Sequence, residues 1–244
     1  MMSQSSGRRG LLWAIMGGLV LVAGIVAIVV AASLAQREPG PTATSDDGSM
    51  SPAPSSSEEP AVEFVDPTAS ENGWALEPIT TDADIYVRAA LEAASTFGTT
   101  KSTREEWLDY LDTWFTPDTR YTSEGDQQVA MEASQVELHQ GVVLPQEEWD
   151  SLAREEGRVV ATATGDLAYV PVSDDDSGDM SIGTSDVTLT FTRTDGDGGE
   201  TSYEEQVRVS VQVLCGPGSV PTPGTAQRAG DCKVVRFFTE PLEP

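Results

Sequence analysis

Residues 206–213, which read QVRVSVQV, decide the fold because apolar and polar side chains alternate strictly along them. A period of two places one set of side chains on one face of a β-strand. The apolar set is Val207, Val209, Val211 and Val213. The same pattern occurs upstream in residues 187–192, VTLTFT, and the DGDGG of residues 195–199 is typical of a hairpin loop. The sequence therefore predicts two antiparallel strands joined by this loop.

Further strands are predicted on both sides of this pair. Residues 159–163 follow a period of two, and a turn at Gly165 and Asp166 leads to a strand over residues 167–172, LAYVPV. The last strand is predicted over residues 233–238, KVVRFF. Four or five such strands predict an antiparallel sheet with one buried and one wetter face.

Two amphipathic helices are predicted ahead of the sheet. The first follows a TDAD sequence at residues 81–84, which resembles a capping box with Asp in place of Glu, and it runs to a stop at Gly98. The second starts at the capping box formed by Thr103 and Glu106, and it ends at Thr116-Pro117. Both carry apolar residues at a spacing of 3.6. A short helical turn is predicted from Pro117 to Tyr121.

Aromatic side chains form a stripe on the second helix, at Trp107, Trp114 and Phe115. At helical spacing we interpret them as core rather than as a ligand-binding box. Residues 123–157 show no clear period. Within them a short strand is predicted over residues 142–144, and a short helix over residues 145–156, with a stop at Gly157. The fold class is α+β, with N-terminal helices packed on a curved antiparallel sheet.

Cys215 and Cys232 are the two cysteines, and they lie at the end of one predicted strand and the start of the next. If these strands pair, the sulfur atoms meet, and a bridge would contribute about 3 kcal/mol on the chain-entropy model. A redox-active pair is the alternative, but the spacing is not C-x-x-C and no basic residue adjoins Cys215. The sequence predicts a structural disulfide, which requires an oxidising compartment.

A long uncharged stretch begins at Leu11 and ends at Leu34 (residues 11–34), directly after Arg8 and Arg9. At 1.5 Å per residue it spans about 36 Å, enough to cross a hydrocarbon core of about 30 Å. The preceding arginines predict a cytoplasmic N-terminus, residues 1–10, and an extracytoplasmic remainder. A cleaved signal peptide ending near residues 33–35, SLA, is the alternative, but its apolar region would be unusually long.

The remaining chain divides into a linker and one domain. Residues 35–80 are rich in Pro, Ser and acidic residues, which predicts a disordered linker whose last part, residues 62–79, docks as an extended lead-in. The domain is predicted over residues 81–240, followed by a tail over residues 241–244. The formal net charge of −26 repels phosphate backbones, and no basic stripe offsets it, so nucleic acid is not an expected partner.

The sequence suggests no catalytic, cofactor-binding or metal-binding residues. His139 is the only histidine, and a packed or surface role is its expected one. The acidic runs at residues 174–179 and 195–200 do not follow the twelve-residue calcium-loop pattern, so we interpret them as solvated loop tips. Tyr110, Tyr121 and Tyr169 are the loose candidates for a pocket residue.

Two segments carry a resemblance to a known family: residues 89–97, AALEAASTF, and residues 103–111, TREEWLDYL. With one membrane span, two helices and a curved sheet, the chain resembles single-pass assembly proteins of conjugation and type IV secretion machines and their actinobacterial relatives. Their domain is related to nuclear transport factor two. The resemblance covers residues 82–240. It implies a cone-shaped, non-catalytic scaffold that contacts other envelope components or itself.

Two functional classes follow. The first is a membrane-tethered interaction module. The second is a ligand-binding or isomerase-like domain, since the same fold can hold a cavity between helices and sheet. The inward strand positions are uniformly apolar, which favours the first class. A cavity above about 300 Å³ that also holds a buried carboxylate would favour the second.

Overall fold

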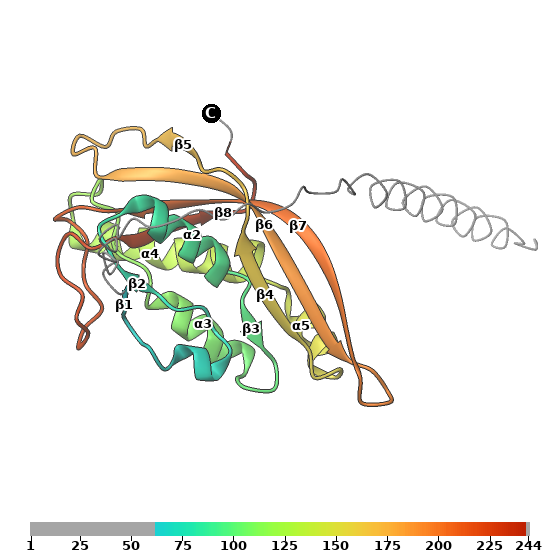
Figure 1. Ribbon diagram of the computed structural model, residues 1–244. Coiled ribbons are helices and arrows are strands. Elements are labelled where there is room, and N and C mark those ends of the chain that lie inside the picture. Colours follow the sequence, from blue (N-terminus) through green and yellow to red (C-terminus); the bar gives the residue numbers. More distant parts are fainter. Residues whose placement is uncertain (1–61, 243–244) are drawn as a thin grey trace, which may run out of the picture. The chain divides into compact units, whose positions relative to one another are not determined.

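The computed structural model describes residues 62–242, and Figure 1 shows helices packed against a curved antiparallel sheet. The predicted span, residues 11–34, lies outside these residues. No helix in residues 62–242 is both long enough and apolar enough to cross a membrane. In chain order the elements are β1 (Glu63–Phe64), η2 (Ala69–Asn72), β2 (Pro78–Ile79), α2 (Ala83–Ala93), β3 (Phe97–Gly98), α3 (Arg104–Asp112), α4 (Glu124–Glu137), η3 (Leu138–Val142), α5 (Gln146–Ala153), β4 (Arg158–Ala163), β5 (Ala168–Pro171), β6 (Met180–Thr194), β7 (Glu200–Leu214) and β8 (Lys233–Phe238).

The sheet is built around the long hairpin of β6 and β7, which forms the curved ribbon in Figure 1. Its strands follow the order β3-β4-β6-β7-β8, and β5 pairs with β6 beside β4. The hairpin is the predicted one, but each strand has 15 residues and extends well beyond the predicted alternation. The extra part of β7, residues 200–206, is exposed and polar on both faces, so it carries no periodic signal.

Strands β4 and β5 flank the predicted turn at Gly165 but do not pair with each other. Instead, β4 pairs with residues 187–192 of β6, and β5 pairs with residues 181–184. Gly165 passes close to β6 between these two pairings: a Cβ at this position would lie 3.0 Å from the backbone nitrogen of Asp186. The turn therefore moves the chain along β6 rather than closing a hairpin.

The two predicted helices form, but both end earlier than predicted. The capping box of Thr103 and Glu106 is present at α3, whereas α2 is capped by Asp82, one residue after the predicted Thr81. Helix α2 ends at Ala93, because Phe97 and Gly98 leave it to pair with β4 as β3. In both helices the apolar spacing continues past the last helical turn, so the pattern overestimates the length.

The segment after α3 also differs from prediction. Helix α3 ends at Asp112, and Phe115 forms a β-bridge with Val234 of β8. The predicted helical turn from Pro117 to Tyr121 is absent: residues 117–121 form a turn in which the Asp118 carboxylate accepts a hydrogen bond from the backbone of Arg120. Pairing with the edge of β8 replaces the last helical turn.

Residues 123–157 contain two α-helices joined by a π-helical turn. Helix α4 was not predicted, because none of its side chains is buried and it lacks an apolar face. Helix α5 matches the predicted short helix. The predicted strand over residues 142–144 is wrong: Val142 ends η3, in which the backbone N–H of Val143 donates to Leu138 at 3.1 Å.

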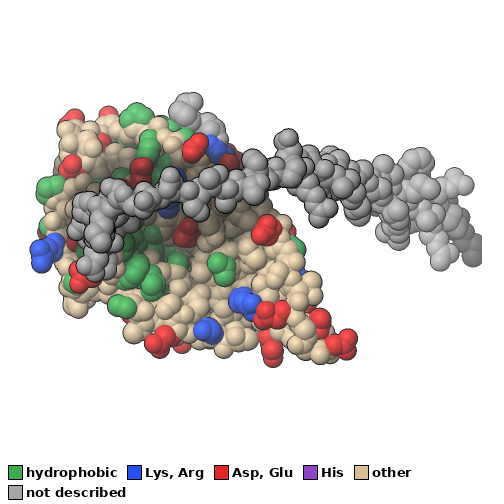
Figure 2. Space-filling view, viewed as in Figure 1, with side chains coloured by type: hydrophobic (Ala, Val, Ile, Leu, Met, Phe, Trp, Pro, Cys, Tyr) green, Lys and Arg blue, Asp and Glu red, His purple; other side chains and the backbone are tan. Residues whose placement is uncertain are grey.

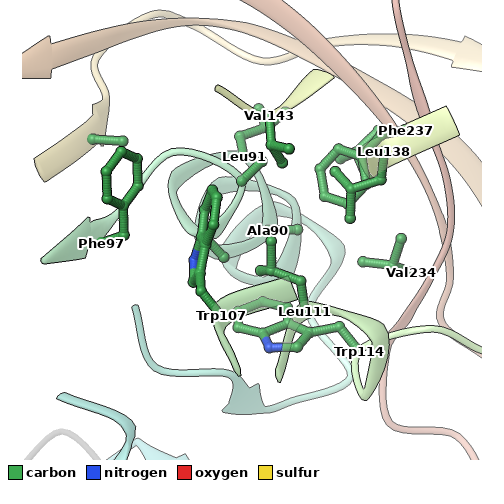
Figure 3. Packing of buried hydrophobic residues seen from close by; sticks show 14 of the residues in the cluster. Ala90, Leu91, Phe97, Trp107, Leu111, Trp114, Leu138, Val143, Val234 and Phe237 are labelled. Carbon is green, nitrogen blue, oxygen red and sulfur yellow. The ribbon is translucent and has the colours of Figure 1, made fainter. Parts of the chain in front are cut away.

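The core lies between the helices and the concave face of the sheet (Figure 3). As predicted, Trp107, Trp114 and Phe115 are core residues, with at most 6% of each exposed. Phe97 and Trp149 stack with their rings 4.3 Å apart, and Leu138 of the π-turn lies against Phe237 of β8. Each such large side chain contributes about 1.5–3 kcal/mol on burial.

Most edges of the sheet are covered. At β4 the backbone N–H groups of Ala161 and Ala163 donate to side chains, those of Thr96 and Glu92, instead of to a neighbouring strand. The outer edge of β8 is bonded to residues 114–116, and α4 packs beside it. Strand β5 is short and ends at Pro171. Within residues 62–242, the longest stretch of strand with a partner on one side only is residues 200–209 of β7.

Candidate functional site

A buried ion pair joins the lead-in to the sheet. Glu77, just before β2, and Lys233, at the start of β8, are 0% and 1% exposed, and their Oε1 and Nζ atoms lie 2.9 Å apart. Tyr86 of α2 and Gln227 also donate to the same Glu77 oxygen, at 2.7 and 3.1 Å. Lys233 donates further to the carbonyl of Thr113. The network ties four distant segments together.

Burial governs the ionisation of this network. Loss of water around Glu77 raises the pKa of its carboxyl, and the nearby Lys233 ammonium opposes that rise. Burial likewise lowers the pKa of Lys233. The pKa of Tyr86 is raised well above its usual value by burial and by the adjacent Glu77. All three side chains are buried and are joined through Glu77 Oε1, while Glu77 Oε2 is buried without a hydrogen-bond partner in residues 62–242. The network therefore links segments of the fold rather than facing a substrate.

The predicted disulfide adjoins the network. Cys215 and Cys232 are bonded, with sulfur atoms 2.05 Å apart, directly after β7 and directly before β8. The backbone N–H of Cys232 donates to Thr80 in the lead-in at 2.8 Å. The lead-in contacts α3, with the rings of Trp74 and Tyr110 stacked at 4.8 Å. This end of the sheet is thus closed by covalent, ionic and aromatic contacts.

The structure does not bring the loose candidate residues together. Tyr110 is buried and donates to the carbonyl of Ala75, and Tyr169 on β5 donates to Asp84 of α2. Burial raises the pKa of both hydroxyls. Tyr121 is exposed in the turn before α4. His139 packs against Asp112, with Nε2 and Oδ1 2.9 Å apart.

The two acidic runs form loops that bond to themselves. Asp195 accepts hydrogen bonds from the backbone of Asp197 and Gly199, and Asp175 accepts from Ser177 and Met180. In the part of the chain that the structure describes, no three His, Cys, Asp or Glu side chains are grouped to hold a metal ion. Acidic side chains gather at the lower right of Figure 2, where Figure 1 shows the tip of the β6–β7 hairpin.

A groove runs along the concave side of β7, where one edge of this strand is open. Its main part has a volume of about 380 Å³, and a neighbouring hollow of about 240 Å³ shares Leu144, Phe191 and Glu205 with it. On the strand side it is lined by five residues of β7: Tyr203, Glu205, Val207, Arg208 and Val209. The opposite wall is formed by residues 140–145 and by α5. We call this feature the β7 groove.

Helix α3 holds the opposite wall in place. The guanidinium of Arg104 donates to the carbonyls of His139 and Leu144, both at 3.1 Å. Gly141 lets the wall approach the end of β8, because a Cβ there would lie 2.4 Å from a methyl carbon of Thr239. A side chain at position 141 would therefore push the wall away from β8.

The groove continues the line of β8. Phe238 is the last residue of β8 and pairs with Ser210 of β7. Beyond it the chain turns away from the sheet edge: the backbone N–H of Leu242 donates to the hydroxyl of Ser210 at 2.8 Å, and the hydroxyl of Thr184 donates to the carbonyl of Leu242. A longer β8 would pair with residues 200–209 of β7. Because β8 ends at Phe238, the groove lies where that extension would be.

The lining of the groove is mainly apolar and includes Val207, Val209 and Leu144. Its charged residues are two carboxylates, Glu205 on β7 and Glu148 on α5, and two arginines, Arg208 on β7 and Arg193 on β6. Its volume exceeds the threshold of about 300 Å³ for a ligand pocket. The buried carboxylates within residues 62–242, Glu77 and Asp118, do not line it. Only one of the two features expected of a catalytic cavity is present.

Comparison with solved structures finds likeness to secretion-system proteins. An IcmL-like type IV secretion system protein from Legionella pneumophila subsp. pneumophila str. Philadelphia 1 matches with a TM-score of 0.38 and 11% identity, over 67% of this chain and 95% of that one. CagV, a VirB8 homolog of the type IV secretion system from Helicobacter pylori strain 26695, matches with a TM-score of 0.32 and 15% identity, over 61% and 89%.

A periplasmic fragment of TraM matches with a TM-score of 0.32 and 14% identity, over 62% of this chain and 89% of that one. No family model and no curated protein matches the sequence. Scores of this size describe a partial likeness of arrangement, and they assign neither a family nor a function to this chain.

Proposed function

We propose that this chain is a membrane-anchored, extracytoplasmic interaction module of an envelope assembly of the secretion or conjugation kind. Residues 11–34 act as the anchor, residues 35–61 as the linker, and the packed domain as the part that meets other proteins. The observation that carries the proposal is the β7 groove, in which an apolar hollow lies beside an open strand edge. Such an edge offers main-chain hydrogen bonds and side-chain pockets to an incoming polypeptide.

The charge of the chain also supports a role in binding other proteins. After Arg9 the chain carries 12 basic and 40 acidic residues, a balance that disfavours nucleic acid and anionic lipid surfaces as partners. The fully buried ion pair of Glu77 and Lys233 does not line the groove. The disulfide between Cys215 and Cys232 agrees with an extracytoplasmic location, where oxidising conditions preserve it.

Crosslinking in native membranes followed by mass spectrometry tests the proposal. The two lysines are Lys101 and Lys233, and Lys233 is buried, so amine-reactive reagents have little to attack. A photoreactive amino acid placed on the exposed surface is the appropriate probe. We expect the full chain to be captured repeatedly with the same envelope proteins. Recovery of the chain alone from every surface position would contradict an assembly role.

A second function, the binding of a small apolar ligand, is favoured by one observation. The main hollow has the volume and the apolar lining of a small-molecule site. Native mass spectrometry of the full chain, released from detergent in the gas phase, would show a co-purified ligand as a constant added mass. Loss of that mass on changing Val207→Asp would place the ligand in the groove.

A further inference from the structure

We propose that the β7 groove binds an extended, basic segment of a second protein, which adds to β7 as a new strand in line with β8. The inference rests on the proposed function and gives it a binding mode and a partner chemistry. The segment would pair with residues 200–209, the part of β7 that has β6 on one side and no strand on the other within residues 62–242.

The backbone supplies the first argument. In a β-strand alternate N–H and C=O groups point to opposite edges, so an open edge of this length displays several unpaired donors and acceptors. Natural proteins protect such edges with short strands, bulges, prolines or covering side chains. The β4 edge has covering side chains, Thr96 and Glu92, and β5 ends in a proline. The β7 edge combines length, openness and an adjoining hollow.

The side chains of the groove supply the second argument. Tyr203, Glu205, Val207 and Val209 lie at alternate positions of β7 and line the groove, as residues on one face of a strand must. An added strand would present its own alternate side chains to the same hollow. Two of them would lie beside Val207 and Val209, and the next would lie beside Glu205. The expected segment is therefore apolar at two alternate positions and basic at the following one.

Charge selects the occupant. The two arginines of the groove are already paired, Arg193 with Glu155 and Arg208 with Asp186. The two carboxylates of the groove, Glu205 and Glu148, have no ion-pair partner in residues 62–242. A second copy of this chain, pairing its own β7 antiparallel to the first, would bring Glu204 and Glu205 near their counterparts, and like charges across strands are unfavourable. The linker of residues 35–61 has five acidic residues, one basic residue and several prolines, which lack the donor a strand needs. A basic segment of another protein satisfies both charge and backbone.

A matched pair of substitutions isolates the groove. Glu205→Lys reverses the charge inside it, and Glu204→Lys makes the same change at the preceding residue, whose side chain points to the opposite face of the strand. Both residues are exposed, so both variants should fold. Because the two variants have the same total charge, any difference in binding between them reflects the face of β7 on which the lysine lies.

The probe is a synthetic peptide of about seven residues, with alternating Thr and Val and one Lys at the position expected opposite Glu205. Its affinity for the full chain in detergent is measured by fluorescence anisotropy. We expect binding to weaken at least about tenfold with Glu205→Lys and to stay unchanged with Glu204→Lys. A peptide with Glu in place of Lys should bind at least about tenfold more weakly.

N-methylation of alternate backbone nitrogens in the peptide removes the donors on one edge and keeps every side chain. Loss of binding by that peptide would support strand addition. Undiminished binding would overturn it and leave only a side-chain pocket. Equal weakening by Glu204→Lys and Glu205→Lys would overturn the groove as the site, because charge alone would then explain the effect.

The source of the strand is tested with a photoreactive residue at position 206 in native membranes. Crosslinks to a basic, extended segment of another protein support the inference. Crosslinks to a second copy of this chain, or to its own residues 35–61, overturn the choice of occupant. Crosslinks to other proteins from surfaces elsewhere but none from position 206 would leave the proposed function standing and overturn the inference. Absence of any captured protein would contradict both.

Discussion

The two halves of β7 have opposite surroundings. Residues 210–214 lie between β6 and β8 and are buried, and the disulfide begins at the next residue, Cys215. Residues 200–206 are exposed and have β6 on one side only. A single strand thus contributes one half to the permanent core and leaves the other half available. The comparison teaches that regular secondary structure does not by itself show which part of a strand is structural.

Breaking the ion pair of Glu77 and Lys233, at the closed end of the sheet, should have the largest effect on stability. Glu77→Gln leaves the Lys233 ammonium buried without an opposite charge, and it should lower the free energy of unfolding by about 3–5 kcal/mol. The same change at Glu204, on the open half, should cost less than about 0.5 kcal/mol. Denaturant unfolding of the full chain in detergent measures both. Equal losses would show that the two halves do not differ as described.

Removing the disulfide should have the next largest effect. The bond closes a loop with a sequence separation of 17 residues, and the variant Cys215→Ser with Cys232→Ser should lose about 3 kcal/mol on the chain-entropy model. Thermal unfolding with and without reductant provides the measurement. Wild-type protein under reductant should match the double variant. Insensitivity to reductant in an unfolding experiment that exposes both cysteines would argue against a stabilising bridge.

A substitution that loosens the groove wall tests whether this wall and the disulfide-closed end of the sheet unfold independently. Arg104→Met retains the aliphatic stem and removes the bonds to the carbonyls of His139 and Leu144, at a cost of about 1.5–3 kcal/mol. Hydrogen exchange should show faster opening of residues 138–145. Protection of the Cys215 and Cys232 region should remain. Uniform loss of protection over the whole domain would mean that the wall and the closed end unfold together.

The ion pair also predicts a pH dependence. Burial already raises the pKa of Glu77, and Lys233→Met removes the ammonium that opposes this rise, so the folded pKa moves further above 4.5. A raised folded pKa contributes stability below the unfolded pKa and loses it as pH rises through the folded value. Lys233→Met should therefore be nearest to wild type below pH 4.5 and fall behind it as pH rises, by about 1.4 kcal/mol for each unit of further shift. A difference in the free energy of unfolding between wild type and Lys233→Met that becomes smaller as pH rises would contradict this prediction.

The smallest effect on stability is expected in the open half. Glu205→Lys and Glu204→Lys should each change the free energy of unfolding by less than about 0.5 kcal/mol, because both side chains are exposed. Their stabilities should agree even where their binding differs. Thermal unfolding provides this check. A large loss with Glu205→Lys alone would show that the groove residue is structural.

Local signals predicted much of the closed architecture. The capping box at Thr103, the alternation of Val207 to Val213 and the position of the two cysteines each depend on neighbouring residues, and each was found as predicted. Helix α4 was missed because none of its side chains is buried, so its sequence carries no apolar stripe. A buried face gives a helix the apolar stripe by which it can be recognised in a sequence.

Neither the ion pair nor the groove could be predicted in the same way. Glu77 and Lys233 are 156 residues apart, and each resembles an ordinary surface charge when read alone. The groove depends on the π-turn at residues 138–142, on the early exit of the chain after Phe238 and on the length of β7. The one local signal is Gly141 within the π-turn, because a glycine permits a close approach that a side chain would block. Its partner, Thr239, lies almost a hundred residues later.

The covered edge of β4 has a consequence for stoichiometry. An extended segment bound at β7 would complete the sheet on one side, while on the other side Thr96 and Glu92 already occupy the backbone donors of Ala161 and Ala163. Growth by strand addition needs two receptive edges on each unit, so that one molecule can receive and the next can continue. With the β4 edge capped and β5 only 4 residues long and ended by Pro171, each domain accepts a single strand and the addition stops there. The geometry favours a discrete one-to-one complex and works against open-ended fibres.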